Sequence, residues 1–146
     1  MVMLTKTILI QTIASFSCHS ITTEIEGLLE QSGLKEGVIT IFSRHTTTAL
    51  IVNEMEERLI MDLEKWLSDL IPAGKGYKHD DLHLRENIPE NEPINAHSHL
   101  RALLLGSDVS VPFENHKLLI GTYQDIIFVE LDGPRRRKVI VSILGM

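Results

Sequence analysis

The last third of the chain consists of short apolar segments that are separated by turn residues. Each segment has the length and the content of β-branched residues that are typical of a strand. The segments are 107–113, 117–120, 126–131 and 137–144, and the turns include Gly121 and Asp132-Gly133-Pro134. Strands joined by turns this short favour antiparallel pairing, because a parallel pair needs a long crossover connection. The sequence therefore favours a fold that contains an antiparallel sheet.

The part of the chain before residue 107 mixes strands with helices. Its apolar patterns predict strands over 3–11, 37–42 and 49–52. Apolar residues at helical spacing predict helices over 20–32 and 54–70, and a shorter one over 98–105. The expected N-caps are Ser20, Asn53 and Ser98, while Gly33 and Pro72 are expected to end the two longer helices.

This order of elements predicts the α+β class. We expect a mostly antiparallel sheet or sandwich core that carries two main helices and one short helix. The length of 146 residues fits a single domain, 1–146, and no internal repeat is present. With 43% hydrophobic and 23% charged residues, the composition is that of an ordinary globular protein.

Charge and hydropathy exclude several classes of function. The net charge of −6 argues against binding of nucleic acid, although Arg135 to Lys138 form a local basic cluster. No apolar stretch is long enough to span a membrane, and the N-terminus does not have the pattern of a signal peptide. The single cysteine, Cys18, cannot form an internal disulfide. We therefore expect a cytoplasmic protein.

Histidines are concentrated in the long connection that precedes the third predicted helix. His97 and His99 lie two positions apart, and on an extended backbone both imidazoles would face one side and could share a metal ion. His45 or His79 could then supply a third ligand, which would leave one position open as in a catalytic zinc site. The alternative is that these imidazoles are solvated or hydrogen-bonded.

A second group of polar residues could bind an anion. Thr46 and Thr47 follow His45 directly, and their hydroxyl groups suit an anion or a water molecule. Arg135 and Arg137 would face one side of a strand, where paired guanidinium groups recognise phosphate or carboxylate. Gln124 and Glu130, slightly upstream, could supply a donor and an acceptor to the same pocket. Alternatively, the threonines are present because threonine favours a strand, and the arginines lie on a solvated face without binding a ligand.

Taken together and in order, these motifs resemble those of the YjbQ-like family, a family of uncharacterised proteins. The motifs are His45-Thr46-Thr47, Val52-Asn53-Glu54, Gly76-Tyr77-Lys78-His79, Asn95 to His99, Gly106-Ser107 with Val111-Pro112, Gly121 to Gln124, and Glu130 to Arg137. The resemblance extends from about residue 5 to the C-terminus. It implies a compact α+β fold, a homotrimer, and a polar pocket at or near the subunit interface that holds a metal or an anion.

The resemblance also implies what the pocket does. Some members resemble weak thiamine-phosphate synthases, so we expect a metal-assisted enzyme that acts on a small phosphorylated or otherwise anionic substrate. The expected roles are catalysis for His45, Glu130 and Gln124, substrate binding for Thr46, Thr47, Arg135 and Arg137, and binding of a divalent metal such as zinc for His97, His99, His45 and His79. The alternative is a homotrimer that binds a small anion or metabolite without catalysis.

Overall fold

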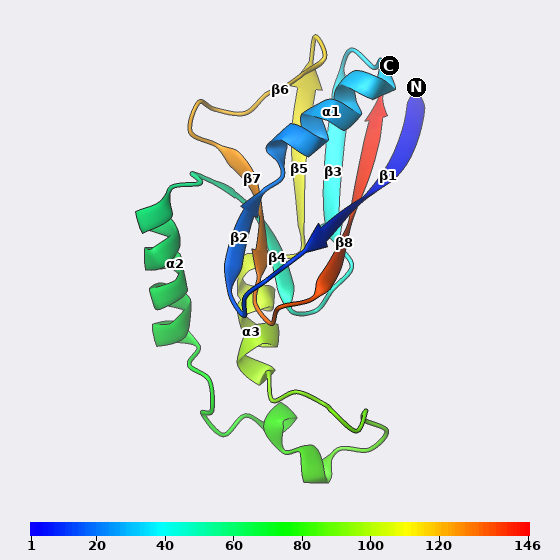
Figure 1. The fold of residues 1–146 in the computed structure, drawn as a ribbon. Helices are drawn as coiled ribbons and strands as arrows, with labels where there is room; N and C mark the ends of the chain where they lie inside the picture. The colour runs from blue at the N-terminus through cyan, green and yellow to red at the C-terminus, as the bar shows by residue number, and fades with distance from the viewer.

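The computed structural model describes residues 1–146, and its strands form two antiparallel sheets (Figure 1). The strands are β1 (Val2–Gln11), β2 (Ser17–Ser20), β3 (Gly37–Ser43), β4 (Thr48–Asn53), β5 (Asp108–Glu114), β6 (Lys117–Leu118), β7 (Asp125–Glu130) and β8 (Arg136–Gly145). The larger sheet has the order β1-β8-β3-β5-β6 and the smaller one the order β2-β7-β4. Every strand pair is antiparallel, which confirms the predicted α+β class.

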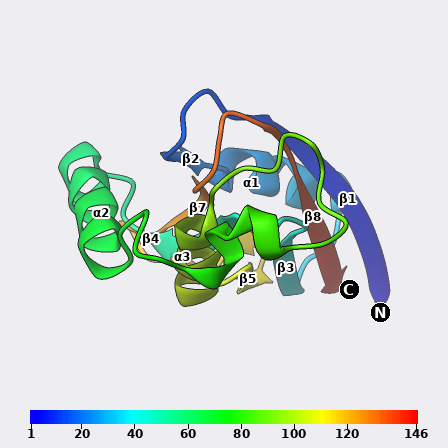
Figure 2. The same cartoon turned by 90° about the horizontal axis from the view of Figure 1, so that it is seen from below.

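Three helices and two short 3₁₀ turns complete the fold. They are α1 (Thr22–Ser32), α2 (Glu57–Leu70), η1 (Lys78–Asp80), η2 (Leu82–Leu84) and α3 (Ala96–Leu105). The connection with η1 and η2 lies at the end of the molecule where α3 begins (Figures 1 and 2). No helix has both the length and the apolar composition that crossing a membrane requires.

Strand β7 is the centre of the structure because both of its faces are buried. Ile126 and Phe128 face the main core, which contains the inner sides of β3, β5 and β8 and the buried side of α1. Ile127 and Val129 face a second, smaller core, which includes Leu67 of α2. This arrangement explains why β7 reads as an unbroken apolar run, since a strand covered on both faces does not alternate.

Helix α2 has only one buried residue, Leu67. The helix lies to one side of the two sheets in both overall views (Figures 1 and 2). Leu63 packs partly against the same core, whereas Met61, Trp66 and Leu70 are each at least half exposed. The attachment of α2 to the sheets therefore depends on few side chains.

The three helices begin at residues other than those the sequence suggested. Ser20 is not an N-cap because it ends β2, a strand that the sequence analysis missed, and its hydroxyl donates to Asp125. Asn53 ends β4, and the carboxylate of Glu56 instead accepts from the first amides of α2. Ser98 lies inside α3, where its hydroxyl donates to the carbonyl of Leu131.

The end of α1 agrees with the prediction. Gly33 follows the helix in the left-handed conformation, with φ of 68°, which a glycine adopts without strain. Helix α3, expected to be the one short helix, starts two residues earlier than predicted and has ten residues. It is therefore nearly as long as α1, which has eleven residues.

Candidate functional site

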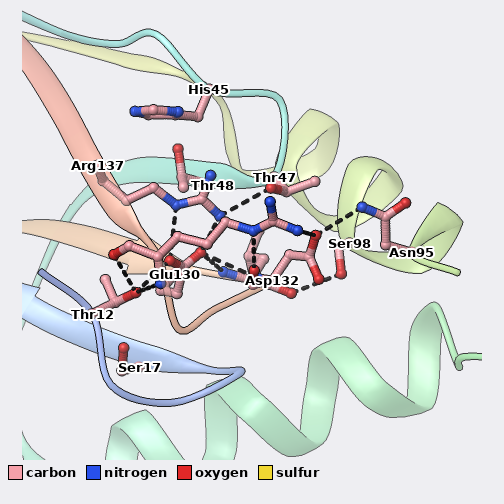
Figure 3. A network of polar contacts seen from close by, with 12 residues as sticks. Thr12, Ser17, His45, Thr47, Thr48, Asn95, Ser98, Glu130, Asp132 and Arg137 are labelled. Carbon is pink, nitrogen blue, oxygen red and sulfur yellow. Dashed lines mark hydrogen bonds and ion pairs between the residues drawn. The ribbon is translucent and has the colours of Figure 1, made fainter. Parts of the chain in front are cut away.

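A buried ion pair joins the ends of β7 and β8. Glu130 and Arg137 are almost fully enclosed, and the Nε and Nη2 atoms of Arg137 donate to the two carboxylate oxygens at 2.8 and 2.5 Å (Figure 3). Nη2 also donates to the hydroxyl of Thr47 at 3.0 Å. Such a bidentate contact holds a guanidinium group in one orientation. The pair therefore fixes the start of β8 against the loop that precedes β4.

Thr12 extends this network and was not anticipated from the sequence. It is fully buried, and its hydroxyl donates to Glu130 Oε1 at 2.6 Å and accepts from the backbone amide of Arg135 at 2.8 Å. Thr12 follows a predicted strand of alternating polar and apolar residues, and nothing in the local sequence indicates that it is buried beside Glu130. Its partners lie more than a hundred residues away in the chain.

The environment of Glu130 does not suit the general base that the sequence suggested. Burial alone would raise the pKa of its carboxyl, but hydrogen bonds from Arg137 and Thr12 and from the backbone outweigh burial and hold the pKa below its ordinary value. The backbone donors are the amides of Leu131 and Asp132. A carboxylate with a lowered pKa and five donors is a weak proton acceptor. Glu130 is therefore a structural anchor of the site.

Beside this network lies an open cleft of about 380 Å³. Six of the residues predicted for the site line it, namely His45, Thr46, Thr47, His99, Arg135 and Arg137. The other lining residues are Arg44, Pro89, Glu92, Pro93, Asn95 and Asp132, which the sequence analysis did not single out for this site. Ten of the twelve lining residues are polar or charged, and the other two are prolines. The cleft therefore offers charges and hydrogen bonds, together with the apolar rings of Pro89 and Pro93.

The loop between β3 and β4 lines the cleft and contains hydrogen-bond donors without partners. The backbone amides of Thr46 and Thr47 donate to no group of the protein. The Nε2 atom of His45 accepts from the backbone amide of Lys138 at 2.8 Å, which leaves the proton of the neutral ring on Nδ1. That nitrogen has no partner within the chain. The loop thus combines amide, hydroxyl and imidazole donors, a combination that suits an anion.

The two histidines of the cleft favour the neutral form. Burial is the largest cause of the lowered pKa of His45, and the positive charge of Arg137 adds to it. Burial likewise lowers the pKa of His99, and so does the neighbouring ring of His79. The two rings pack edge to face, with 4.7 Å between their centroids. Because Nε2 of His45 already accepts from the amide of Lys138, His99 is the cleft imidazole that can gain a proton when a negative charge approaches.

Most charges around the cleft are already paired. Arg135 contacts Asp132 at 3.0 Å, Arg85 lies 3.6 Å from Glu92, and Arg137 is bound to Glu130. The Asp132 carboxylate also accepts from the amide group of Asn95. Arg44 is exposed and forms no ion pair. The unbalanced charge of the cleft is therefore positive, although the whole chain carries a net charge of −6.

The chain does not assemble the predicted metal site. His97 and His99 both lie within α3, where positions two apart are rotated by about 200°, so they do not face one side as on an extended backbone. His79 lies beside His99, but His45 approaches the cleft from a different loop. No three His, Cys, Asp or Glu side chains are close enough to hold an ion together. The four predicted ligands are therefore not gathered at one point within one chain, and the divalent metal stays a prediction.

Gln124 does not join the other predicted residues. It precedes β7, whereas Glu130 ends the same strand, so the two lie at opposite ends. The side-chain oxygen of Gln124 accepts from the backbone amide of Gly121 and closes the turn before β7. Within one chain, its role is that of a turn residue, and its predicted catalytic role has no support from this placement.

Comparisons with known proteins agree with this fold and with the order of the motifs. The family model described as UPF0047 protein YjbQ-like matches residues 6–146. A UPF0047 protein of Methanothermobacter thermautotrophicus is 44% identical over 125 residues, which cover 86% of this chain and 80% of the relative. A UPF0047 protein of Archaeoglobus fulgidus is 44% identical over 124 residues, with 85% and 88% covered.

Solved structures share the whole fold. A YbjQ-like protein of unknown function from Sulfolobus solfataricus P2 superimposes with a TM-score of 0.87 at 35% identity, and 99% of this chain and 98% of that one are covered. A hypothetical protein from Aeropyrum pernix K1 gives a TM-score of 0.88 at 31% identity, with 98% and 99% covered. The chain therefore belongs to the YjbQ-like family.

Proposed function

We propose that the cleft between the β3–β4 loop and the start of β8 binds a small anionic molecule, and that phosphorylated metabolites are the ligand class. The observation that carries this proposal is the β3–β4 loop, whose Thr46 and Thr47 amides have no acceptor in the protein. Adjacent backbone N–H groups of this kind bind the oxygens of phosphate. The adjoining hydroxyl of Thr46 and Nδ1 of His45 would add two further donors.

The charges around the cleft support the same ligand class. The arginines are Arg44, Arg85, Arg135 and Arg137, and the carboxylates are Glu92, Glu130 and Asp132, so positive charge is in excess by one. A dianion would interact with Arg44 without displacing an existing partner. Because hydrogen bonds to charged groups contribute about 1.5–3 kcal/mol, Arg44 is the side chain with the largest expected effect on affinity.

Calorimetric titration with inorganic pyrophosphate tests the proposal. We expect saturable binding to the wild-type chain and a loss of about tenfold or more in affinity in the Arg44→Ala variant. Arg58, which is exposed on α2 and distant in sequence from the cleft, provides a control of equal charge change. If Arg58→Ala weakens binding as much as Arg44→Ala, the interaction is with the overall charge of the chain and the proposed site is wrong.

The lowered pKa of His99 predicts how binding depends on pH. A protonated imidazole attracts an anion, so affinity should rise as the pH falls below the ordinary histidine value of about 6.5. Sulfate is the appropriate probe because it remains a dianion throughout this range. We expect the His99→Gln variant to show a flatter pH profile than the wild type. A profile unchanged by this substitution would exclude His99 from the anion site.

We also propose an enzymatic role at the same cleft, and the observation that favours it is the imidazole of His99, which lines the cleft and whose pKa is lowered by burial. A neutral imidazole beside a bound phosphorylated molecule is suited to accept a proton. The thiamine-phosphate synthesis implied by the resemblance stays a prediction, and its phosphorylated substrates fall within the proposed ligand class. The predicted divalent ion stays a prediction, since no three His, Cys, Asp or Glu side chains of one chain are gathered to hold it.

The predicted homotrimer likewise stays a proposal. Exposed apolar side chains on α2, including Met61 and Trp66, support an interface between copies of the chain. Light scattering coupled to size-exclusion chromatography should give three times the mass of 16.5 kDa. We expect Trp66→Glu to reduce that mass, because the charge would have to be buried at the interface. A wild-type mass equal to one chain would contradict the proposal.

A further inference from the structure

The polar cleft is continuous with a second hollow of different chemistry. This second hollow, of about 480 Å³, lies between the β3–β4 loop and the C-terminal half of α3. Arg44, His45, Thr46 and His99 line both hollows, so these four residues form the boundary between them. A ligand held at the boundary can therefore extend into either side.

Aromatic and branched aliphatic side chains lie only on the second side of this boundary. Phe42 and Leu103 line the second hollow and are 46% and 78% exposed, and Ala102 contributes a smaller apolar surface. In the first cleft, the rings of Pro89 and Pro93 are the only apolar side chains. Ligand sites commonly combine an apolar wall with a few polar groups that fix orientation, and an aromatic ring such as that of Phe42 favours contact with another flat ring.

The second hollow offers little to a second charge. It contains no carboxylate, and its only arginine is Arg44, which also faces the first cleft. The hydroxyl groups of Ser43 and Thr48 are bonded to each other at 2.5 Å and are therefore already satisfied. What lies beyond the shared boundary, against Phe42, Ala102 and Leu103, should be uncharged and at least partly apolar, because that side of the hollow supplies no charged side chain.

We infer that the site is bipartite and takes an organic phosphate whose uncharged, ring-shaped or otherwise apolar body lies against Phe42 and Leu103, while its phosphate is held by the β3–β4 loop. This inference rests on the proposed function, because it assumes that the loop binds the anionic group. It narrows the ligand class from small anions in general to phosphate esters with an apolar body.

Phenyl phosphate and inorganic phosphate are the probes that test this inference. Calorimetric titration of the wild-type chain should show that phenyl phosphate binds about tenfold more tightly than inorganic phosphate, since burial of its ring removes apolar surface from water. In the Leu103→Ala and Phe42→Ala variants, we expect this advantage to shrink about threefold or more, with the affinity for inorganic phosphate unchanged.

Leu104 provides the matched control. It lies next to Leu103 on α3 and is 47% exposed, but it does not line the hollow, so Leu104→Ala should leave both affinities unchanged. If inorganic phosphate binds but phenyl phosphate binds no more tightly, or if the Phe42 and Leu103 variants change both affinities equally, the bipartite site is wrong and the anion site stands. If neither probe binds, the proposed function itself fails.

Discussion

Replacing Arg137 with methionine should lower the free energy of unfolding by about 3–5 kcal/mol, because it leaves the buried carboxylate of Glu130 without its ionic partner. The side chain of Glu130 is fully enclosed, and Arg137 donates to both of its oxygens. Methionine fills a comparable space but donates no hydrogen bond. Urea denaturation of the two proteins at neutral pH measures the difference.

Two further variants separate loss of the ion pair from a general effect of substitution. The double variant Glu130→Gln with Arg137→Met removes both charges, so it should regain part of the lost stability. Arg136→Ala changes the exposed neighbour of Arg137 and should stay within about 0.5 kcal/mol of the wild type. A double variant that is as unstable as Arg137→Met would mean that packing, and not the unpaired carboxylate, causes the loss.

The pH dependence of this difference provides an independent test. In the wild type, the pKa of Glu130 is lowered in the folded state, so its contribution to stability is present above the unfolded value of about 4.3 and is lost as the pH falls through the folded pKa. In Arg137→Met, burial should raise that pKa instead, so the carboxyl group takes up a proton as the pH falls and no longer carries an unpaired buried charge. The stability gap between the two proteins should therefore narrow as the pH falls.

Replacing Leu67 with alanine should have the second large effect, a loss of about 2–5 kcal/mol that is concentrated in α2. Leu67 is the only buried residue of this helix, and it packs in the smaller core with Ile127 and Val129 of β7. Removal of its side chain leaves a cavity at the main attachment of α2. Hydrogen exchange should show amide protection lost across 57–70 by a larger factor than in β3 or β8.

Leu70 is the matched control for this experiment. It lies one turn from Leu67 on the same helix but is 55% exposed, so Leu70→Ala removes the same atoms without a buried cavity. We expect the exchange of α2 in this variant to remain close to that of the wild type. Equal effects of the two substitutions would show that α2 does not depend on Leu67 for its attachment.

Much of the fold could be predicted because its signals are local. The alternation of apolar residues in β3, β5 and β8 reflects burial on one face, which leaves a periodic pattern. The apolar stripe of α2 predicted a helix correctly, although Leu67 is its only buried residue. β2 was missed because four residues, with Cys18 and His19 at its centre, are too few to show a period. The start of α2 was missed because Asn53 is a preferred cap, but that residue pairs with Asp125 as the end of β4.

The candidate site could be predicted only in part. His45, Thr46 and Arg135 stand out as polar residues at the ends of predicted strands, and the structure brings them to one cleft. The buried partnership of Thr12 with Glu130 depends on the pairing of β1 with β8, which no local pattern reveals. The metal prediction depended on an extended backbone at His97, and the start of α3 at Ala96 removed that condition.

The most direct test of the anion site is to follow the backbone amides of the β3–β4 loop by nuclear magnetic resonance while inorganic phosphate is added. The Thr46 and Thr47 amides have no acceptor within the protein, so a bound phosphate should shift their proton signals downfield in a saturable manner. The amide of His45 is the internal reference, because it already donates to the hydroxyl of Ser43. We predict saturable shifts at Thr46 and Thr47 that exceed those at His45. The absence of any saturable shift at these two amides would contradict the proposed function.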